Sequence, residues 1–144
     1  MDLPSGHVIR EGIECVHFDR VHAWLSSSYW TPGIARDRIE HASRHSALVL
    51  SMFAPDGAQI GFLRVVSDKA RFAYLCDVWI DEAHRGKGLA RTMVRHAMTH
   101  PDFTTVTTWT LATKDAQSVY APLGFRDIRE EGAFPNTWMV HRKS

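Results

Sequence analysis

The 144-residue sequence predicts a mixed α/β fold, and three observations carry that prediction. Three runs rich in β-branched and aromatic residues follow one another between residues 46 and 80. A stretch with helical periodicity begins after Gly88, and an alternating run at 104–113 comes after it. Strands and helices that succeed one another in this way pack as layers, with helices against a sheet.

The first 45 residues are predicted to form one strand and two helices. The stretch 7–13 (HVIREGI) permits a short strand, and Asp19 offers an N-cap for a helix with regularly spaced apolar residues. The segment 26–33 is predicted as a loop because it holds a serine cluster, a proline and a glycine. A short polar helix is then expected over 36–45.

The central strands are predicted to form an antiparallel meander. The runs 46–54 and 58–68 flank Pro55-Asp56-Gly57, a turn sequence that favours a β-hairpin. The third run, 70–80, is joined to 104–113 by the helix that follows the glycine pair. A helical connection implies parallel pairing, or a splayed junction, between those two strands.

The C-terminal part is expected to complete the sheet. Asp115 is predicted to cap a short helix that Gly124 ends. The stretches 126–132 and 136–142 are then predicted to pair as antiparallel strands. The expected sheet is therefore mixed and mostly antiparallel, with about seven strands.

Length and composition limit the classes of protein that fit. A chain of 144 residues is the size of one domain, and we expect 1–144 to fold as such. Seventeen Lys and Arg residues against sixteen Asp and Glu leave a net charge of +1, which gives no general attraction to nucleic acid or anionic lipid. Any anion site must be local.

The sequence contains no pattern typical of a disulfide framework, a metal site or a membrane segment. Cys15 and Cys76 lie far apart, without the spacing of zinc ligands. Histidine pairs four residues apart lack an evident third ligand, so no metal is expected. Since no signal peptide or apolar run of about 20 residues is evident, we expect a soluble protein of the reducing cytoplasm.

The stretch 77–90 (DVWIDEAHRGKGLA) contains the main functional signal. A strand-like run gives way to a glycine pair, and a helix begins at once. A helix N-terminus has main-chain N–H groups without internal partners, and the glycines Gly86 and Gly88 let a diphosphate approach them. Lys87 and Arg91 could add positive charge. A plain connection is the alternative, because neither a Walker A loop nor a dinucleotide-binding fingerprint is present.

The same stretch resembles the acetyl-CoA-binding motif (Q/R)xxGx(G/A) of the GNAT superfamily of N-acetyltransferases. The matching residues are Arg85, Gly88 and Ala90, and the segment 112–125 (ATKDAQSVYAPLGF) is similar to a later block of the family. The SSYW stretch before residue 31 further resembles small stand-alone bacterial members. The resemblance implies a GNAT-like sheet with helices on both faces, acetyl-CoA as the cosubstrate, and a homodimer as one possible assembly.

The resemblance also assigns roles to individual residues. A main-chain amide at Val78 or Ile80 would polarise the thioester carbonyl. Tyr120 would protonate the departing sulfur, although packing between a helix and the sheet is the alternative. Asp115 stands where many members have Asn, so its cofactor contact is open. The implied cofactor-binding set is Val78, Ile80, Arg85, Gly86, Lys87, Gly88, Leu89, Ala90, Arg91 and Asp115.

An acceptor amine must lose its proton before it attacks the thioester. An alkylamine with a pKa of about 10.4 is neutral in roughly one molecule in two thousand at pH 7. Asp77 is the carboxylate on the strand that leads to the motif, and period-two alternation predicts that it shares a strand face with Leu75 and Trp79. It could act as a general base, directly or through water, could orient the acceptor, or could merely bond a nearby loop. The expected acceptor pocket consists of Trp24, Tyr29, Trp30 and Arg64.

The function that these features favour is acetyl-CoA-dependent N-acetylation of a primary amine on a small-molecule or amino-acid-like acceptor, by direct transfer in a ternary complex. A non-catalytic acyl-CoA-binding regulatory module is the first alternative. A nucleotide- or phosphate-binding protein of another fold is the second. Neither nucleic acid nor a membrane is expected as a partner.

Overall fold

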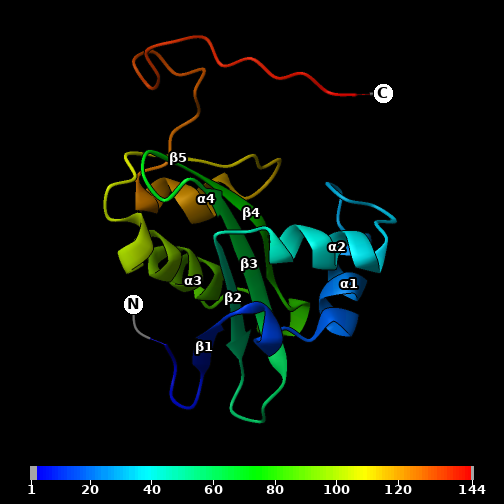
Figure 1. The fold of residues 1–144 in the computed structure, drawn as a ribbon. Coiled ribbons are helices and arrows are strands. Elements are labelled where there is room, and N and C mark those ends of the chain that lie inside the picture. Colours follow the sequence, from blue (N-terminus) through cyan, green and yellow to red (C-terminus); the bar gives the residue numbers. More distant parts are fainter. Residues whose placement is uncertain (1–2, 144) are drawn as a thin grey trace. The chain divides into compact units, whose positions relative to one another are not determined.

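The computed structural model describes residues 3–143 and separates into two compact units, Met1–Ala112 and Thr113–Ser144. The first unit contains one five-stranded sheet in the order β1-β2-β3-β4-β5 (Figure 1). Its strands are β1 (Val8–Glu11), β2 (Leu48–Phe53), β3 (Gln59–Ser67), β4 (Phe72–Ile80) and β5 (Thr108–Thr110).

The pairs β1–β2, β2–β3 and β3–β4 are antiparallel, and β5 is parallel to β4. The predicted hairpin is confirmed, because Ala54 and Ala58 close the β2–β3 turn with a 2.9 Å main-chain bond. The parallel pairing that the helical connection implied is confirmed as well. The chain therefore follows the predicted meander and then crosses over to β5.

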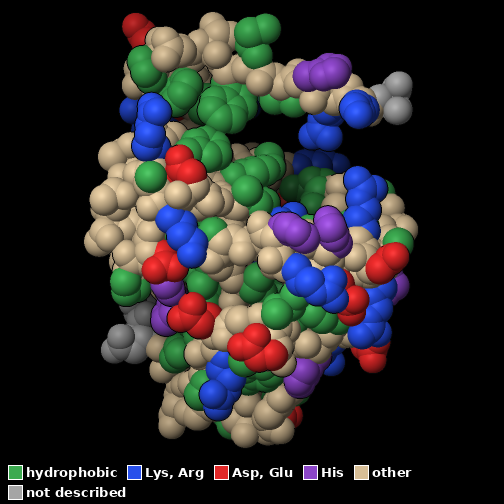
Figure 2. Space-filling view, viewed as in Figure 1, with side chains coloured by type: hydrophobic (Ala, Val, Ile, Leu, Met, Phe, Trp, Pro, Cys, Tyr) green, Lys and Arg blue, Asp and Glu red, His purple; other side chains and the backbone are tan. Residues whose placement is uncertain are grey.

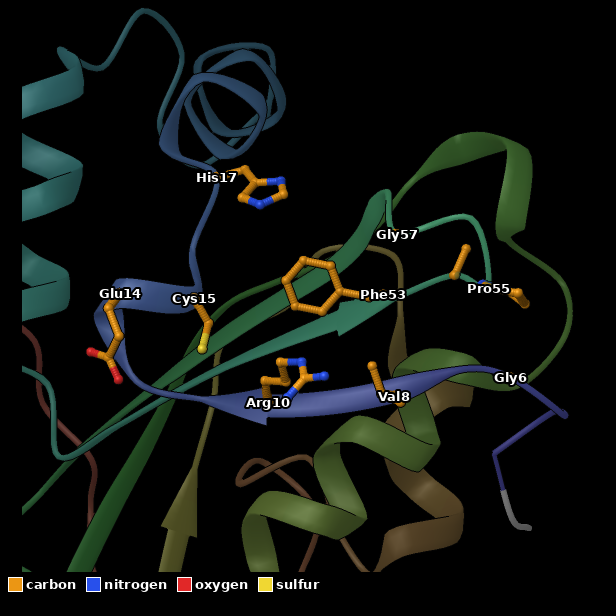
Figure 3. A pocket seen from close by; sticks show the side chains of 10 residues that line it. Gly6, Val8, Arg10, Glu14, Cys15, His17, Phe53, Pro55 and Gly57 are labelled. Carbon is orange, nitrogen blue, oxygen red and sulfur yellow. The ribbon is translucent and has the colours of Figure 1, made fainter.

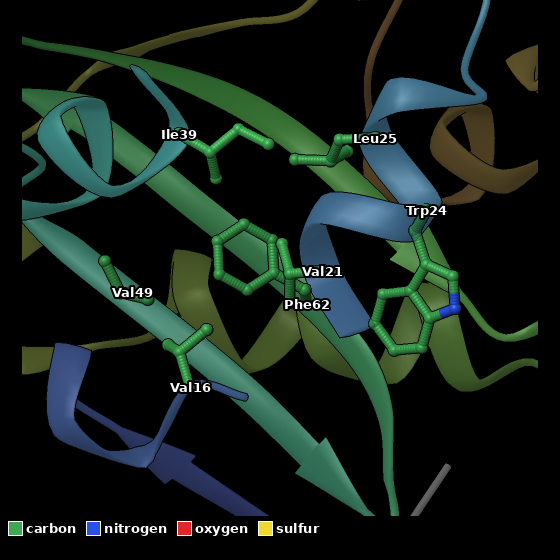
Figure 4. Packing of buried hydrophobic residues seen from close by; sticks show 7 residues of the cluster. All are labelled: Val16, Val21, Trp24, Leu25, Ile39, Val49 and Phe62. Carbon is green, nitrogen blue, oxygen red and sulfur yellow. The ribbon is translucent and has the colours of Figure 1, made fainter. Parts of the chain in front are cut away.

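Helices cover both faces of this sheet, as the family resemblance led us to expect. On one face, α1 (Phe18–Ser26) and α2 (Arg36–Arg44) bury apolar side chains against β2 and β3 (Figure 4). On the other face, α3 (Leu89–Met98) presents Met93 to Gly61, so closely that a Cβ on this glycine would lie 2.8 Å from the methionine sulfur. Three short 3-10 helices are η1 (Ile13–Cys15), η2 (Glu82–His84) and η3 (Pro101–Phe103).

The sheet has five strands rather than the expected seven. The second unit contains α4 (Gln117–Tyr120) and η4 (Ala121–Leu123), and no strand forms within its described residues, 113–143. Beyond the short helices, main-chain bonds close local turns, such as those from Glu130 to Asp127 and from Ala133 to Glu130. Gly132 has a φ of 76°, which interrupts extended structure. Alternating side chains alone do not make a strand when the backbone bonds locally.

Two predicted helix caps are also wrong. Helix α1 begins at Phe18, one residue before Asp19, and the Asp19 carboxylate instead forms an ion pair with Arg36. Helix α4 begins after Ala116, whose amide donates to the Thr113 hydroxyl at 3.0 Å. Asp115 therefore does not cap this helix.

Candidate active site

The outer edge of β4 opens where β5 stops pairing with it. The parallel ladder joins Phe72 to Thr108 and ends where Tyr74 meets Thr110. From Leu75 onward, the described part of the chain supplies no strand partner on that edge. The predicted splayed junction is therefore present, and it leaves main-chain groups of β4 free for another partner.

A β-bulge interrupts β4 beside this open edge. Cys76 pairs with Arg64 and Trp79 pairs with Phe62, so that three steps on β4 match two steps on β3. Asp77 lies inside the bulge with a φ of 54°, in the left-handed region. Non-glycine residues are uncommon in this region, and Asp is among those that tolerate it best.

The bulge makes the predicted shared face of Leu75, Asp77 and Trp79 wrong. Leu75 lies opposite Val65, whereas Trp79 lies opposite Phe62. Directly paired residues share a face and neighbours along a strand alternate, so Leu75 and Trp79 point to opposite sides of the sheet. The extra residue in β4 shifts the alternation by one.

The amides of Val78 and Ile80 point toward the open edge. The amide of Asp81 donates to the Ile60 carbonyl of β3 at 2.7 Å. Because main-chain groups alternate between the two edges of a strand, the N–H and C=O of Ile80 face away from β3. The strand is regular after the bulge, so the N–H of Val78, two residues before Ile80, also faces away from β3. These are the two amides that the sequence suggested as carbonyl donors.

The glycine loop leads directly into α3. Gly86 and Gly88 have φ values of 83° and 75°, a left-handed backbone that glycine adopts at no steric cost. Gly88 is the N-cap of α3 and provides no side-chain cap. Within the described chain, the structure records no hydrogen bond from the amides of residues 86–90. These donors are therefore available to an anion, and Leu89, Ala90 and Arg91 form the first turn of the helix.

The Arg85 side chain turns back from this loop onto β4. Its Nε–H donates to the main-chain carbonyl of Ile80 at 2.8 Å. Its Cζ atom lies 4.8 Å from the centre of the Trp79 ring. Lys87, by contrast, is an exposed side chain of the same loop.

Asp77 contacts two of the predicted acceptor-pocket residues. The Nε–H of Arg64 donates to Asp77 Oδ2 at 2.8 Å, and Nε1–H of Trp30 donates to Asp77 Oδ1 at 2.8 Å. The exposed fractions of the Arg64 and Asp77 side chains are 18% and 12%, so this ion pair is largely shielded from water. One alternative for Asp77 was a structural hydrogen bond to a nearby loop. The bond from Trp30, a residue of the loop 26–33, is such a bond.

A group of aromatic rings adjoins this ion pair. Trp24 and Trp79 are stacked with centroids 6.5 Å apart, and Trp30 lies 5.9 Å from Trp79. Tyr29 contacts Trp30 edge-on at 5.0 Å. Three predicted acceptor-pocket residues therefore come together, and Trp79 joins them. Sequence reasoning missed Trp79, although its place two residues after Asp77 was a usable signal.

Cys76 also adjoins the ion pair, but its chemistry differs from that of a nucleophile. Burial raises the pKa of the Cys76 thiol, and the charge of Asp77 acts in the same direction, while Arg64 opposes them. Thiolate, not thiol, is the reactive form. The position therefore favours a neutral packing side chain.

Asp115 and Tyr120 belong to the second unit. Asp115 is exposed, whereas Tyr120 is buried with a 9% exposed fraction. The Tyr120 ring contacts Phe125 edge-on, with centroids 5.9 Å apart. This contact lies within the second unit, and the catalytic role of Tyr120 stays a prediction.

A cavity of about 470 Å³ lies at the other edge of the sheet. Arg10, Cys15, His17 and Phe53 are among the side chains around it (Figure 3). The His17 and Phe53 rings meet edge-on at 5.4 Å. None of the residues that line it was predicted to bind a cofactor or an acceptor, so the cavity is separate from the β4 edge.

The surface carries charges of both signs. On the part of the first unit that Figure 2 displays, basic and acidic side chains are interspersed. Within the described residues, no helix has the length and apolarity needed to cross a membrane.

Comparison with known proteins assigns the family. The model of the acetyltransferase (GNAT) family matches residues 13–125. The chain belongs to the GNAT family of acetyltransferases. A solved structure from Xanthomonas campestris pv. campestris, described as an acetyltransferase of this family, is 31% identical, with 96% of each chain covered and a TM-score of 0.82. No curated protein matches the chain.

A more distant solved structure shares the GNAT fold alone. Glucosamine-6-phosphate N-acetyltransferase from Arabidopsis thaliana is 16% identical, with 95% of this chain and 97% of that chain covered and a TM-score of 0.65. Membership of the GNAT family implies acetyl transfer from acyl-CoA, with acetyl-CoA as cosubstrate. The predicted family and fold class are therefore confirmed, and the alternative of a nucleotide-binding protein of another fold is removed.

Proposed function

We propose that this GNAT protein is an N-acetyltransferase that moves an acetyl group directly to the primary amine of a small-molecule or amino-acid-like acceptor. The observation that carries the proposal is the adjacency of two sets of free main-chain donors. One set is the loop at 86–90, and the other is the open edge of β4. Both sets belong to the first unit, and only the short segment that contains η2 separates Ile80 from Gly86.

The loop fits the diphosphate of coenzyme A. Its unbonded amides lie at the N-terminus of a ten-residue helix, where the partial charge is positive. Apart from Gly86 and its two chain neighbours, no described residue has an atom within 4 Å of the point where a Cβ on Gly86 would be, so the backbone is open to a ligand there. Lys87 and Arg91 would add charge beside the amides of Gly88, Leu89 and Ala90.

The open edge of β4 fits the acyl end of the same cosubstrate. Acetyl-CoA supplies a thioester carbonyl and a thiol leaving group with a pKa near 8.5. The outward amides of Val78 and Ile80 would bond the pantetheine arm and stabilise negative charge on the carbonyl oxygen. Main-chain donors in a strand need little reorganisation, which suits this role.

Asp77 is the proposed acceptor of the amine proton, directly or through water. Its two oxygens already accept bonds from Arg64 and Trp30. A carboxylate has about four lone-pair sites, so two remain for an amine or a water molecule. The two bonds would hold the carboxylate in one orientation while Trp24 and Tyr29 complete an aromatic wall for the acceptor.

The second unit would contribute the remaining roles. Tyr120 is the proposed proton donor to the departing thiolate, and Asp115 remains a proposed cofactor contact. A cytoplasmic location, which the sequence led us to expect, and a homodimer, which the family resemblance gave as one possible assembly, belong to the same proposal. Light scattering after size-exclusion chromatography would test the dimer.

Ligand-dependent melting tests the cosubstrate part of the proposal. CoA and acetyl-CoA at 100 times their dissociation constants should each add about 2.7 kcal/mol of stability and raise the melting temperature by several degrees. ATP and NAD serve as controls. A protein that neither CoA nor acetyl-CoA stabilises would contradict the proposed function.

A screen of amine acceptors that reports free thiol tests the catalytic part. Amino acids, amino sugars and alkylamines should be compared, and Tyr120→Phe should slow turnover while CoA binding is unchanged. CoA binding without thiol release from any acceptor would favour the non-catalytic acyl-CoA-binding module instead.

A further inference from the structure

Arg85 occupies the first position of the cofactor motif, but its side chain lies against β4. One flat guanidinium group bonds the Ile80 carbonyl at 2.8 Å and lies 4.8 Å from the Trp79 ring centre. The Arg85 guanidinium therefore contacts the end of a strand and an indole ring. This placement differs from that of a side chain extended toward the loop amides at 86–90.

The carbonyl that Arg85 bonds is part of the open edge. The N–H and C=O of Ile80 face away from β3, because the next amide, that of Asp81, bonds to Ile60. Arg85 thus restrains the final peptide groups of β4. The amide of Ile80 is one of the two proposed donors to the acyl carbonyl, so its orientation matters to the reaction.

The Trp79 side chain makes no hydrogen bond with a described residue that would fix the orientation of its ring. Its Nε1–H is buried, and no hydrogen-bond acceptor contacts it within the described residues. A buried indole N–H usually finds a partner. The ring is instead held by stacking on Trp24, by contact with Trp30 and by the guanidinium of Arg85. Trp30 in turn bonds Asp77, so movement of Trp79 would reach the proposed base.

We propose that Arg85 is a positioning residue, which holds the end of β4 and the Trp79 ring, and that it is not a phosphate ligand. The effect of this positioning on acetyl transfer rests on the proposed function. A phosphate contact requires a positive charge within reach, which lysine also supplies. Arg85 makes both observed contacts at once, because its Nε–H bonds the carbonyl while Cζ lies over the indole, and lysine has no planar group that could replace it in both. Arg85→Lys therefore separates the two roles.

The first test measures CoA affinity by calorimetry for Arg85→Lys, Arg85→Met and the control Lys87→Met, which alters an exposed cation of the same loop. If Arg85 positions β4, both Arg85 variants should weaken CoA binding to a similar extent, by about 3- to 10-fold. Near-wild-type affinity in Arg85→Lys, with a loss of tenfold or more in Arg85→Met, would overturn the proposal. So would wild-type affinity in both.

The second test does not depend on CoA. Both Arg85 variants should alter the tryptophan emission of the ligand-free protein, and the change should disappear in a Trp79→Phe background. Emission that Arg85 substitutions leave unchanged would overturn the proposal. A wild-type protein that binds no CoA would instead count against the proposed function, while the emission series would still decide whether Arg85 holds Trp79.

Discussion

Asp77 is held in a backbone conformation that costs about 1 to 2 kcal/mol for most L-residues. Its two side-chain bonds offset that cost, and both partners come from distant parts of the chain, 13 and 47 residues away. The partners also fix which way the carboxylate faces. The local sequence around 77 therefore does not determine the geometry of this residue; the packing of β3 and the α1–α2 loop does.

Asp77→Asn should separate the catalytic from the structural role of this residue. Asparagine tolerates the left-handed backbone and keeps an oxygen for Trp30, but it loses the charge that faces Arg64. A general base contributes about 10²- to 10⁴-fold, so kcat/KM should fall by that order, while stability falls by about 1 to 3 kcal/mol.

A pH–rate profile and a melting curve check this prediction. The acidic limb of the kcat/KM profile should disappear in Asp77→Asn if the carboxylate accepts the amine proton. A variant that melts earlier but keeps kcat and the acidic limb would leave Asp77 with a structural role only. Trp30→Phe, which removes the other donor to Asp77, is the matched control.

At the scale of elements, β4 depends on the turn that precedes it. Asp68 Oδ1 accepts from the amides of Ala70, Arg71 and Phe72 at 2.9, 2.8 and 3.1 Å. These bonds lower the pKa of the Asp68 carboxyl below its ordinary 3.8, with the amide of Arg71 as the largest cause. The turn directs β4 along β3 and so supports the alignment that leads to the bulge.

Asp68→Ala should lower the melting temperature at pH 7 by about a few degrees, because three amides lose their acceptor. A carboxyl whose pKa is lower in the folded state stabilises the fold above its unfolded pKa. That contribution is lost as pH falls through the folded pKa, below 3.8. The difference in melting temperature between wild type and Asp68→Ala should therefore shrink below about pH 3.8.

Calorimetry at several pH values measures this difference, and Asp68→Asn is the control because it keeps an oxygen without the charge. Asp68→Asn should fall between wild type and Asp68→Ala at pH 7. A difference that stays constant from pH 7 to pH 3 would contradict the electrostatic origin of the effect.

At the scale of the whole molecule, the family match crosses the boundary between the two compact units. It covers 13–125, whereas the boundary lies between Ala112 and Thr113. The proposed catalytic set is divided in the same way, with Asp77 in the first unit and Tyr120 in the second. The extent of the family match supports the proposal that the chain functions as one domain.

A single domain should unfold in one cooperative transition. At about 0.7 kcal/mol per residue, the enthalpy near 60 °C should be about 100 kcal/mol for the 144 residues. Scanning calorimetry measures this value and compares it with the van't Hoff enthalpy. Two resolved transitions would show that the units unfold independently.

The sequence by itself determined the family, the meander and the crossover helix. These features follow from local signals: hydrophobic periods, a Pro-Asp-Gly turn, and a glycine loop before an amphipathic helix. The loop at 86–90 was located by the same means, since left-handed glycines and an uncapped helix start are local properties. The prediction of two C-terminal strands was wrong, because an alternation of apolar and polar residues at 126–142 does not specify a partner strand.

Only the tertiary structure decided how the site is arranged. The bulge at Asp77 depends on register with β3, and it reversed the predicted relation between Leu75 and Trp79. The bonds of Asp77 to Trp30 and Arg64, and the turn of Arg85 onto β4, join residues through space. Periodicity in the sequence predicts which face of an element is buried. A one-residue bulge moves every later side chain of the strand to the opposite face, and only the pairing with the neighbouring strand shows where the bulge lies.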